Sequence, residues 1–235
     1  MTLTIALNDI NELNKKAADI ILKSITKLLL SQKKVVLAVP GGRSVVGIFN
    51  LLKEKDIPWK KVHIFMVDER LVPLNDPRSN FKLAEENFIG ELMNKGLLLQ
   101  ENVHSFLMDL GTSYYEAELR KYNGRYDIVL LSSGEDGHVA GLYPNHHSIR
   151  NNSDFFISMS DSPKPPEDRM SASRKLLMKS KVAILLFFGE IKMGAYRKFL
   201  DDNIDVDSCP AKLVLSVNDS YVLTDLNLKG KNEKS

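Results

Sequence analysis

The chain has 235 residues and a formal net charge of +2, and its hydrophobic fraction of 43% is ordinary for a globular protein. This length is enough to bury a substantial core in one large domain, which we expect over residues 1–228. The basic residues are dispersed, and no apolar run approaches membrane-spanning length, which argues against a nucleic-acid or membrane surface. The single cysteine, Cys209, excludes an internal disulfide. Together with a start that lacks a signal-peptide pattern, it favours a cytoplasmic protein.

In the first half of the chain, helical periodicity alternates with short apolar runs. Asp9 and Glu12 form a capping pair at the start of the first helix, and Ser113 and Glu116 have the spacing of a capping box. Strands without a polar face are typical of parallel sheets that are covered on both sides. We expect helices over 10–29, 45–52, 80–92 and 113–120, and strands over 35–39, 62–67 and 103–106.

The second half continues the alternation. We expect strands over 126–131, 155–159, 182–188, 213–216 and 221–223, and helices over 173–178 and 192–200. The helix before 178 can start at Ser171 or Ser173. A polar tail over 229–235 is expected to be mobile. The pattern predicts an α/β fold with a Rossmann-like, mostly parallel sheet flanked by helices.

A loop rich in glycine, acid and histidine follows the strand over 126–131. Its sequence is Ser132-Ser133-Gly134-Glu135-Asp136-Gly137-His138. Ligands of open α/β sheets bind where such loops leave the carboxyl ends of strands, and a histidine there can transfer a proton near neutral pH. The alternative is a glycine-rich turn with an incidental solvated histidine.

Two other strand-to-helix junctions are typical of anion sites. Pro40-Gly41-Gly42-Arg43-Ser44 places glycines before a helix, where backbone N–H groups favour an anion and Arg43 adds a bidentate donor. Lys192 lies in the first turn of another helix, after Gly189, and a lysine there is unfavourable unless an anion is near. The alternative for each is a tight turn. The first motif matches neither the Walker nor the dinucleotide pattern.

Charged residues also follow the strand over 62–67 and occupy a proline-rich loop. Asp68, Glu69 and Arg70 fit substrate contacts or an ion pair that orders the loop. The prolines of 162–169 stiffen a segment that presents Lys164 and Arg169, unless it is only a solvated linker. We expect structural roles for His63 and His104, which fall in strand-like segments.

His146 and His147 follow His138 closely, which raises the question of a metal. Adjacent histidines fit one tetrahedral site poorly, and neither HExxH nor CxxC is present. We therefore predict no metal site from the sequence.

The motifs together resemble 6-phosphogluconolactonases, within the superfamily they share with glucosamine-6-phosphate deaminases. The resemblance rests on motifs in family order over most of the chain: 40–44, 67–73 with Ser79-Asn80-Phe81, 134–138 with Leu142-Tyr143-Pro144, 162–166 with Arg169, and 189–192. Ser132-Ser133 replaces the usual Gly-Met or Gly-Leu. Val139 and Gly141 replace the usual threonine and serine. These departures concern substrate contacts rather than the reaction class.

The resemblance implies hydrolysis of 6-phospho-D-glucono-1,5-lactone without a metal or organic cofactor. We expect a monomer or weak homo-oligomer. His138 would be the base, and Asp136 would orient the site, although residues two apart need not touch. Substrate and phosphate contacts would come from Gly41, Gly42, Arg43, Ser44, Asp68, Arg70, Arg169 and Lys192. The alternatives are a glucosamine-6-phosphate deaminase, whose Asn-Glu-Pro segment is replaced here by Leu142-Tyr143-Pro144, and a non-catalytic sugar-phosphate sensor.

Overall fold

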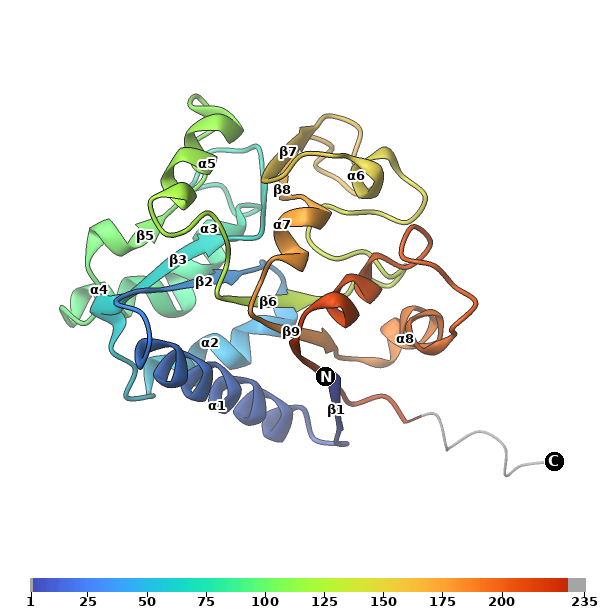
Figure 1. Ribbon diagram of the computed structural model, residues 1–235, viewed down its shortest axis with the longest axis horizontal. Coiled ribbons are helices and arrows are strands. Elements are labelled where there is room, and N and C mark those ends of the chain that lie inside the picture. Colours follow the sequence, from blue (N-terminus) through green and yellow to red (C-terminus); the bar gives the residue numbers. More distant parts are fainter. Residues whose placement is uncertain (1, 228–235) are drawn as a thin grey trace.

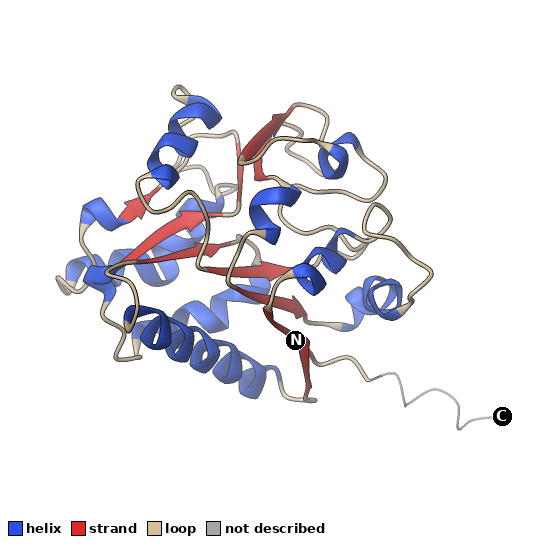
Figure 2. Cartoon of the chain, viewed as in Figure 1, coloured by secondary structure: helices blue, strands red, loops and turns tan. Residues whose placement is uncertain are grey.

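A seven-stranded parallel sheet forms the centre of the protein in the computed structural model, which describes residues 2–227 (Figures 1 and 2). The predicted tail over 229–235 lies outside the described residues. The strand order is β1-β10-β9-β6-β2-β3-β5, so the predicted α/β class is confirmed. The strands are β1 Thr2–Ala6, β2 Val35–Val39, β3 Val62–Met66, β5 Val103–His104, β6 Ile128–Ser132, β9 Val182–Phe187 and β10 Asp219–Thr224.

Helices cover both faces of this sheet (Figure 1). Successive residues of β2 alternate between two cores: Val36 packs with α5, and Leu37 packs with α1 and α2. This alternation explains why the strand is apolar throughout. One face carries α1 Ile10–Leu29, α2 Val46–Lys53, α3 Asn80–Ala84 and α4 Gly90–Asn94. The other carries α5 Gly111–Arg120, α6 His147–Arg150, α7 Arg174–Met178 and α8 Met193–Leu200. Within residues 2–227, no helix is long and apolar enough to cross a membrane.

A second, antiparallel sheet of three strands lies beside the main one. It consists of β4 Asp68–Arg70, β8 Arg169–Ala172 and β7 Phe156–Met159, in the order β4-β8-β7. We did not predict β8, because its residues follow the proline-rich loop. The pairing places Arg70 opposite Arg169.

Two local predictions are wrong, and one strand of the main sheet was not predicted. The strand expected over 213–216 is part of a 3₁₀ helix, Pro210–Ser216, because a short apolar run does not distinguish a buried strand from a buried helical turn. The helix α5 begins at Gly111, so Ser113 is not its cap. The strand β1 was not predicted, since its pairing with β10 joins the two ends of the chain. The caps at Asp9 and Ser173 are confirmed.

The strand order reverses direction between β2 and β6. From β2 the chain proceeds outward to β3 and β5, and from β6 it proceeds the other way to β9 and β10. Loops that leave the carboxyl ends of strands on either side of such a reversal separate and form a crevice. The loops after β2, β6 and β9 carry the predicted site residues other than Asp68, Arg70 and Arg169.

Candidate functional site

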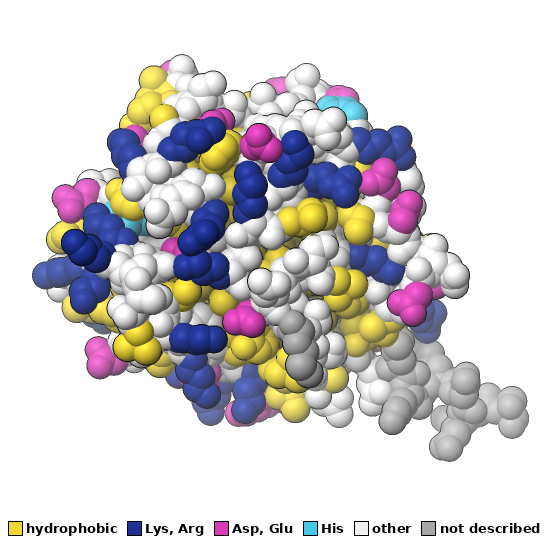
Figure 3. Space-filling model, viewed as in Figure 1, with side chains coloured by type: hydrophobic (Ala, Val, Ile, Leu, Met, Phe, Trp, Pro, Cys, Tyr) yellow, Lys and Arg dark blue, Asp and Glu magenta, His cyan; other side chains and the backbone are white. Residues whose placement is uncertain are grey.

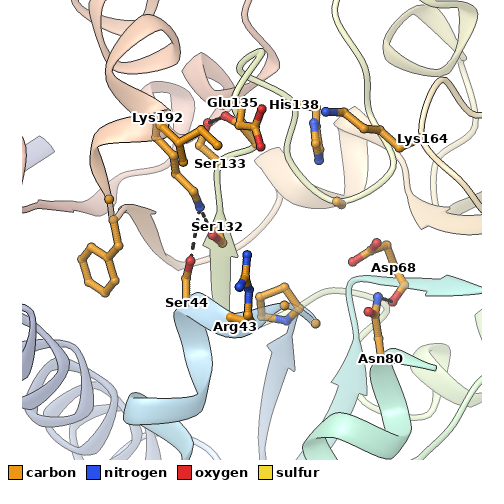
Figure 4. Close-up of a pocket in the computed structure, with 18 of the residues that line it drawn as sticks. Arg43, Ser44, Asp68, Asn80, Ser132, Ser133, Glu135, His138, Lys164 and Lys192 are labelled. Carbon is orange, nitrogen blue, oxygen red and sulfur yellow. Dashed lines mark hydrogen bonds between the residues drawn. The ribbon is translucent and has the colours of Figure 1, made fainter. Parts of the chain in front are cut away.

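A cavity of about 580 Å³ lies at this reversal (Figure 4). It is lined by residues from the loops after β2, β6 and β9, from β4 and β8, and from the proline-rich loop. All eight residues predicted to contact substrate line it, as does His138: Gly41, Gly42, Arg43, Ser44, Asp68, Arg70, Arg169 and Lys192. The structure therefore brings together segments that are up to about 150 residues apart in the chain.

His138 is held by a short turn that starts at Gly134. The Gly134 N–H donates to the His138 carbonyl at 2.8 Å, and Gly137 adopts a φ of 99°, which favours glycine. A Cβ on Gly134 would lie 2.1 Å from Nδ1 and Cε1 of the imidazole. Gly134 is thus needed so that the ring can lie against the backbone of its own loop.

Asp136 contacts His138 directly. Its Oδ1 lies 2.6 Å from Nδ1 and also accepts the His138 backbone N–H at 3.1 Å. Burial would raise the pKa of Asp136, but the hydrogen bond and the charge of His138 outweigh it and hold that pKa below its ordinary value. An ionised carboxylate at Nδ1 keeps a proton on that nitrogen, so the free lone pair is on Nε2.

Two helical segments begin beside this loop, each after a glycine with a positive φ. Gly42, with a φ of 94°, precedes the 3₁₀ turn Arg43–Val45 and α2, and Gly189, with a φ of 91°, precedes Glu190–Lys192 and α8. Because β6 lies between β2 and β9, the two starts flank the loop of His138. Both direct N–H groups toward the cavity end of the sheet, which suits an anion.

Lys192 connects these three segments. Its Nζ donates to Ser132 Oγ at 2.8 Å and to Ser44 Oγ at 3.3 Å (Figure 4). Burial lowers its pKa from 10.5 to about 8, and the nearby charges of Glu135 and Asp225 only partly oppose this. A half-buried ammonium ion with only hydroxyl partners is a good counter-ion for an anionic ligand.

The cavity is cationic. Five basic side chains line it, against the two carboxylates Asp68 and Glu135. Among the residues that the structure describes, the charged groups of Arg43 and Lys164 have no hydrogen-bond or ion-pair partner, and both lie at the cavity (Figure 4). The remaining basic residues are Arg70, Arg169 and Lys192.

Both Arg70 and Arg169 already donate hydrogen bonds to backbone carbonyls of the protein. Arg70 Nη1 donates to the carbonyl of Arg78 at 2.5 Å. Arg169 is 5% exposed and donates to the carbonyls of Lys164, Pro165 and Pro166, while its Nη1 lies 3.9 Å from Asp68. Arg169 therefore shapes the proline-rich loop in addition to facing the cavity.

Asn80 also lines the cavity, although we had named it only within the motif Ser79-Asn80-Phe81 and not among the predicted site residues. Its Nδ2 donates to the Asp68 carbonyl at 2.9 Å, and its buried Oδ1 has no protein partner. A Cβ on Gly41 would lie 1.8 Å from that oxygen. No local signal distinguishes such a residue from an ordinary cap. The actual cap of α3 is Ser79, and Glu69 accepts hydrogen bonds from this helix start, so Glu69 is structural.

The fold and the site together define an α/β enzyme with a histidine–aspartate pair in a cationic cavity. The family described as glucosamine-6-phosphate isomerases/6-phosphogluconolactonase matches residues 8–223. The chain belongs to this family, which confirms the resemblance seen in its motifs.

Relatives and solved structures agree with this assignment. A 6-phosphogluconolactonase from Borreliella burgdorferi is 33% identical over 200 residues, which cover 83% of this chain and 85% of the relative. The crystal structure of 6-phosphogluconolactonase from Thermotoga maritima superposes with a TM-score of 0.82 at 25% identity, covering 95% of this chain and 99% of that one. A monomeric glucosamine-6-phosphate deaminase shares the fold, with a TM-score of 0.78 at 20% identity.

Proposed function

We propose that this protein hydrolyses 6-phospho-D-glucono-1,5-lactone to 6-phospho-D-gluconate, the second step of the oxidative pentose phosphate pathway. The observation that carries the proposal is the His138 imidazole, oriented by Asp136, in a cavity with five basic side chains. Curated relatives with the lactonase name support the choice of substrate. The cytoplasmic location and the monomeric or weakly oligomeric state remain predictions.

In the proposed reaction, His138 acts as a general base. Nε2 takes a proton from a water molecule while the water oxygen attacks C1 of the lactone, and the carbonyl oxygen becomes an oxyanion. When the bond from C1 to the ring oxygen breaks, the imidazolium returns the proton to that oxygen. A positioned base of this kind increases the reaction rate by about a hundredfold or more. Asp136 remains ionised and stabilises the transient imidazolium.

The substrate phosphate would be held away from His138 by the two helix starts. Lys192, Arg43 and the backbone N–H groups after Gly42 supply positive charge and donors at one place in the cavity. Binding energy from this remote group fixes the ring for attack by water. Lys164, on the other side of His138, is a candidate for the hydroxyl or carboxylate end of the ligand (Figure 4).

A direct assay tests both the activity and the base. Lactone is generated freshly, and the spontaneous hydrolysis rate is subtracted from the rate with enzyme. We expect His138→Asn to fold normally and to lose at least about a hundredfold in kcat. Arg197→Ala, an exposed change on α8 outside the cavity, is the control and should retain the wild-type rate.

Three outcomes would contradict the proposal. A near-normal kcat for His138→Asn would remove this residue from the mechanism. Ammonia release from glucosamine 6-phosphate without lactone hydrolysis would identify a deaminase, and ligand binding without turnover of either compound would identify a sensor.

A further inference from the structure

We propose that His146, His147 and Asp161 form a binding site for a divalent transition-metal ion of the Zn²⁺ class, outside the catalytic cavity. None of the three residues lines that cavity. From the sequence we had predicted no metal site, because adjacent histidines fit one tetrahedral site poorly and we had considered only His138 as a third ligand. The fold instead brings in Asp161, a residue from a distant loop.

The candidate ligand atoms already converge. His147 Nε2 lies 2.9 and 3.0 Å from the two carboxylate oxygens of Asp161, and His146 Nε2 lies 3.5 Å from Oδ2. One atom from each residue can be chosen so that all lie within 4.8 Å of one another. Tetrahedral ligands about 2.1 Å from Zn²⁺ are about 3.4 Å apart, so only small side-chain movements are needed.

A hydrogen bond at Nδ1, the ring nitrogen that would not bind the metal, orients the ring of His146. Its Nδ1 lies 3.0 Å from Oγ of the buried Ser148, and that Oγ accepts the Tyr143 backbone N–H at 3.1 Å. When Nδ1 donates to this oxygen, the Nε2 lone pair is directed away from the protein, as ligation requires. In the other tautomer, Nδ1 accepts the Ser148 N–H at 3.3 Å, and a bound ion would select against that state.

The donor set indicates the class of metal. Two imidazoles and one carboxylate suit Zn²⁺ and similar ions, whereas Ca²⁺ and Mg²⁺ prefer oxygen ligands throughout. The side chains of His147 and Asp161 are 56% and 59% exposed, so an ion can enter and water can complete its coordination. Histidine side chains reach the surface on the face drawn in Figure 3. None of the hydrogen bonds or ion pairs of the described residues joins Asp161 to a lysine or arginine.

A metal here would connect two segments that border the catalytic cavity. Asp161 precedes Ser162, whose Oγ donates to Tyr143 Oη at 2.9 Å, and the Tyr143 ring lies 4.8 Å from the His138 ring. The same loop carries Lys164 into the cavity. The ion would therefore stabilise the proline-rich loop against the start of α6, and we expect Zn²⁺ to raise the Tm.

The test is a Zn²⁺ titration of the tag-free, chelator-treated full chain, followed by calorimetry and by competition with a fluorescent chelator. We expect one saturable site, with affinity reduced at least about tenfold in His147→Ala and in Asp161→Asn. Asp207→Asn is the matched control because it removes a carboxylate that pairs with Arg150 of the same helix, and it should bind normally. His138→Asn should also bind normally.

Two further readouts complete the test. Co²⁺ should give a visible absorption spectrum with the wild-type chain and not with Asp161→Asn, and the Zn²⁺-dependent rise in Tm should be lost in the same variant. Absence of saturable binding, equal affinity in Asp161→Asn, or loss of binding in His138→Asn would overturn the proposal. If saturable binding is absent, or if Asp161→Asn binds with equal affinity, the three side chains form only an ion pair between loops.

Discussion

Gly134 and His138 show how one missing side chain determines the position of the proposed base. The imidazole occupies the space where any other residue at position 134 would place its Cβ. The sequence indicated a glycine-rich turn, and the structure shows that the requirement is steric contact with the ring. Gly194, in the first turn of α8, provides a contrast, because a Cβ added there would meet no atom within 4 Å apart from its chain neighbours and the backbone of its own helix.

We therefore expect Gly134→Ala to displace the imidazole and to lower kcat by about a hundredfold or more, since the base no longer reaches the attacking water. Gly194→Ala should leave kcat unchanged and should raise the free energy of unfolding by about 0.5 kcal/mol. Steady-state kinetics and denaturant unfolding check both variants. An active Gly134→Ala enzyme would show that the ring position is not critical.

At the level of elements, the two helix starts on either side of β6 act as a pair joined by Lys192. The Nζ contacts Ser44 at the start of one segment and Ser132 at the end of β6. Burial lowers the Lys192 pKa to about 8, so its charge is lost as the pH rises through that value. The phosphate of the ligand is already dianionic above about pH 7, because its second pKa is about 6.

Binding of 6-phosphogluconate should accordingly weaken as the pH rises above about 8, with a slope that approaches tenfold per pH unit. Lys192→Arg should bind with an affinity that stays flat over the same range, since arginine remains charged. Lys198→Met, an exposed change on the same helix, should retain the wild-type profile. Calorimetry at several pH values measures these affinities, and the same slope in Lys192→Met would assign the titration to another group.

At the scale of the whole molecule, one buried histidine pair joins the neighbouring strands β3 and β5 of the main sheet. His63 Nδ1 lies 3.0 Å from His104 Nε2, and both rings stack with aromatic neighbours, which confirms their predicted structural roles. Burial lowers both pKa values to about 4 from the ordinary 6.5. For His63 the charge of Lys34 acts in the same direction, and for His104 the charge of Glu118 only partly opposes burial.

The folded state therefore binds fewer protons than the unfolded state between about pH 4 and about pH 6.5, and stability falls as the pH drops through this window. We expect a loss on the order of 2 kcal/mol per imidazole between about pH 7 and pH 5. When it is measured by denaturant unfolding across this range, the free energy of unfolding of His104→Gln should depend less steeply on pH than that of the wild-type protein. An identical pH dependence would mean that the pair does not govern acid sensitivity.

Local patterns were sufficient to predict the alternation of elements and the residues around the cavity. Apolar runs indicated the parallel strands, glycines indicated the helix starts, and the motif order indicated the family. The signals for strands and helices depend on neighbours in the chain, and a physical rule for each acts over a few residues. The family was indicated by a resemblance over most of the chain.

The side-chain contacts could be found only in the tertiary structure, even where the two residues lie close together in the chain. They include the bond between Asp136 and Nδ1, the three carbonyls that hold Arg169, the unpaired oxygen of Asn80, and the approach of Asp161 to His146 and His147. A sequence names such side chains, but the twist of the sheet, the register of its strands and the space left beside each glycine determine which of them meet.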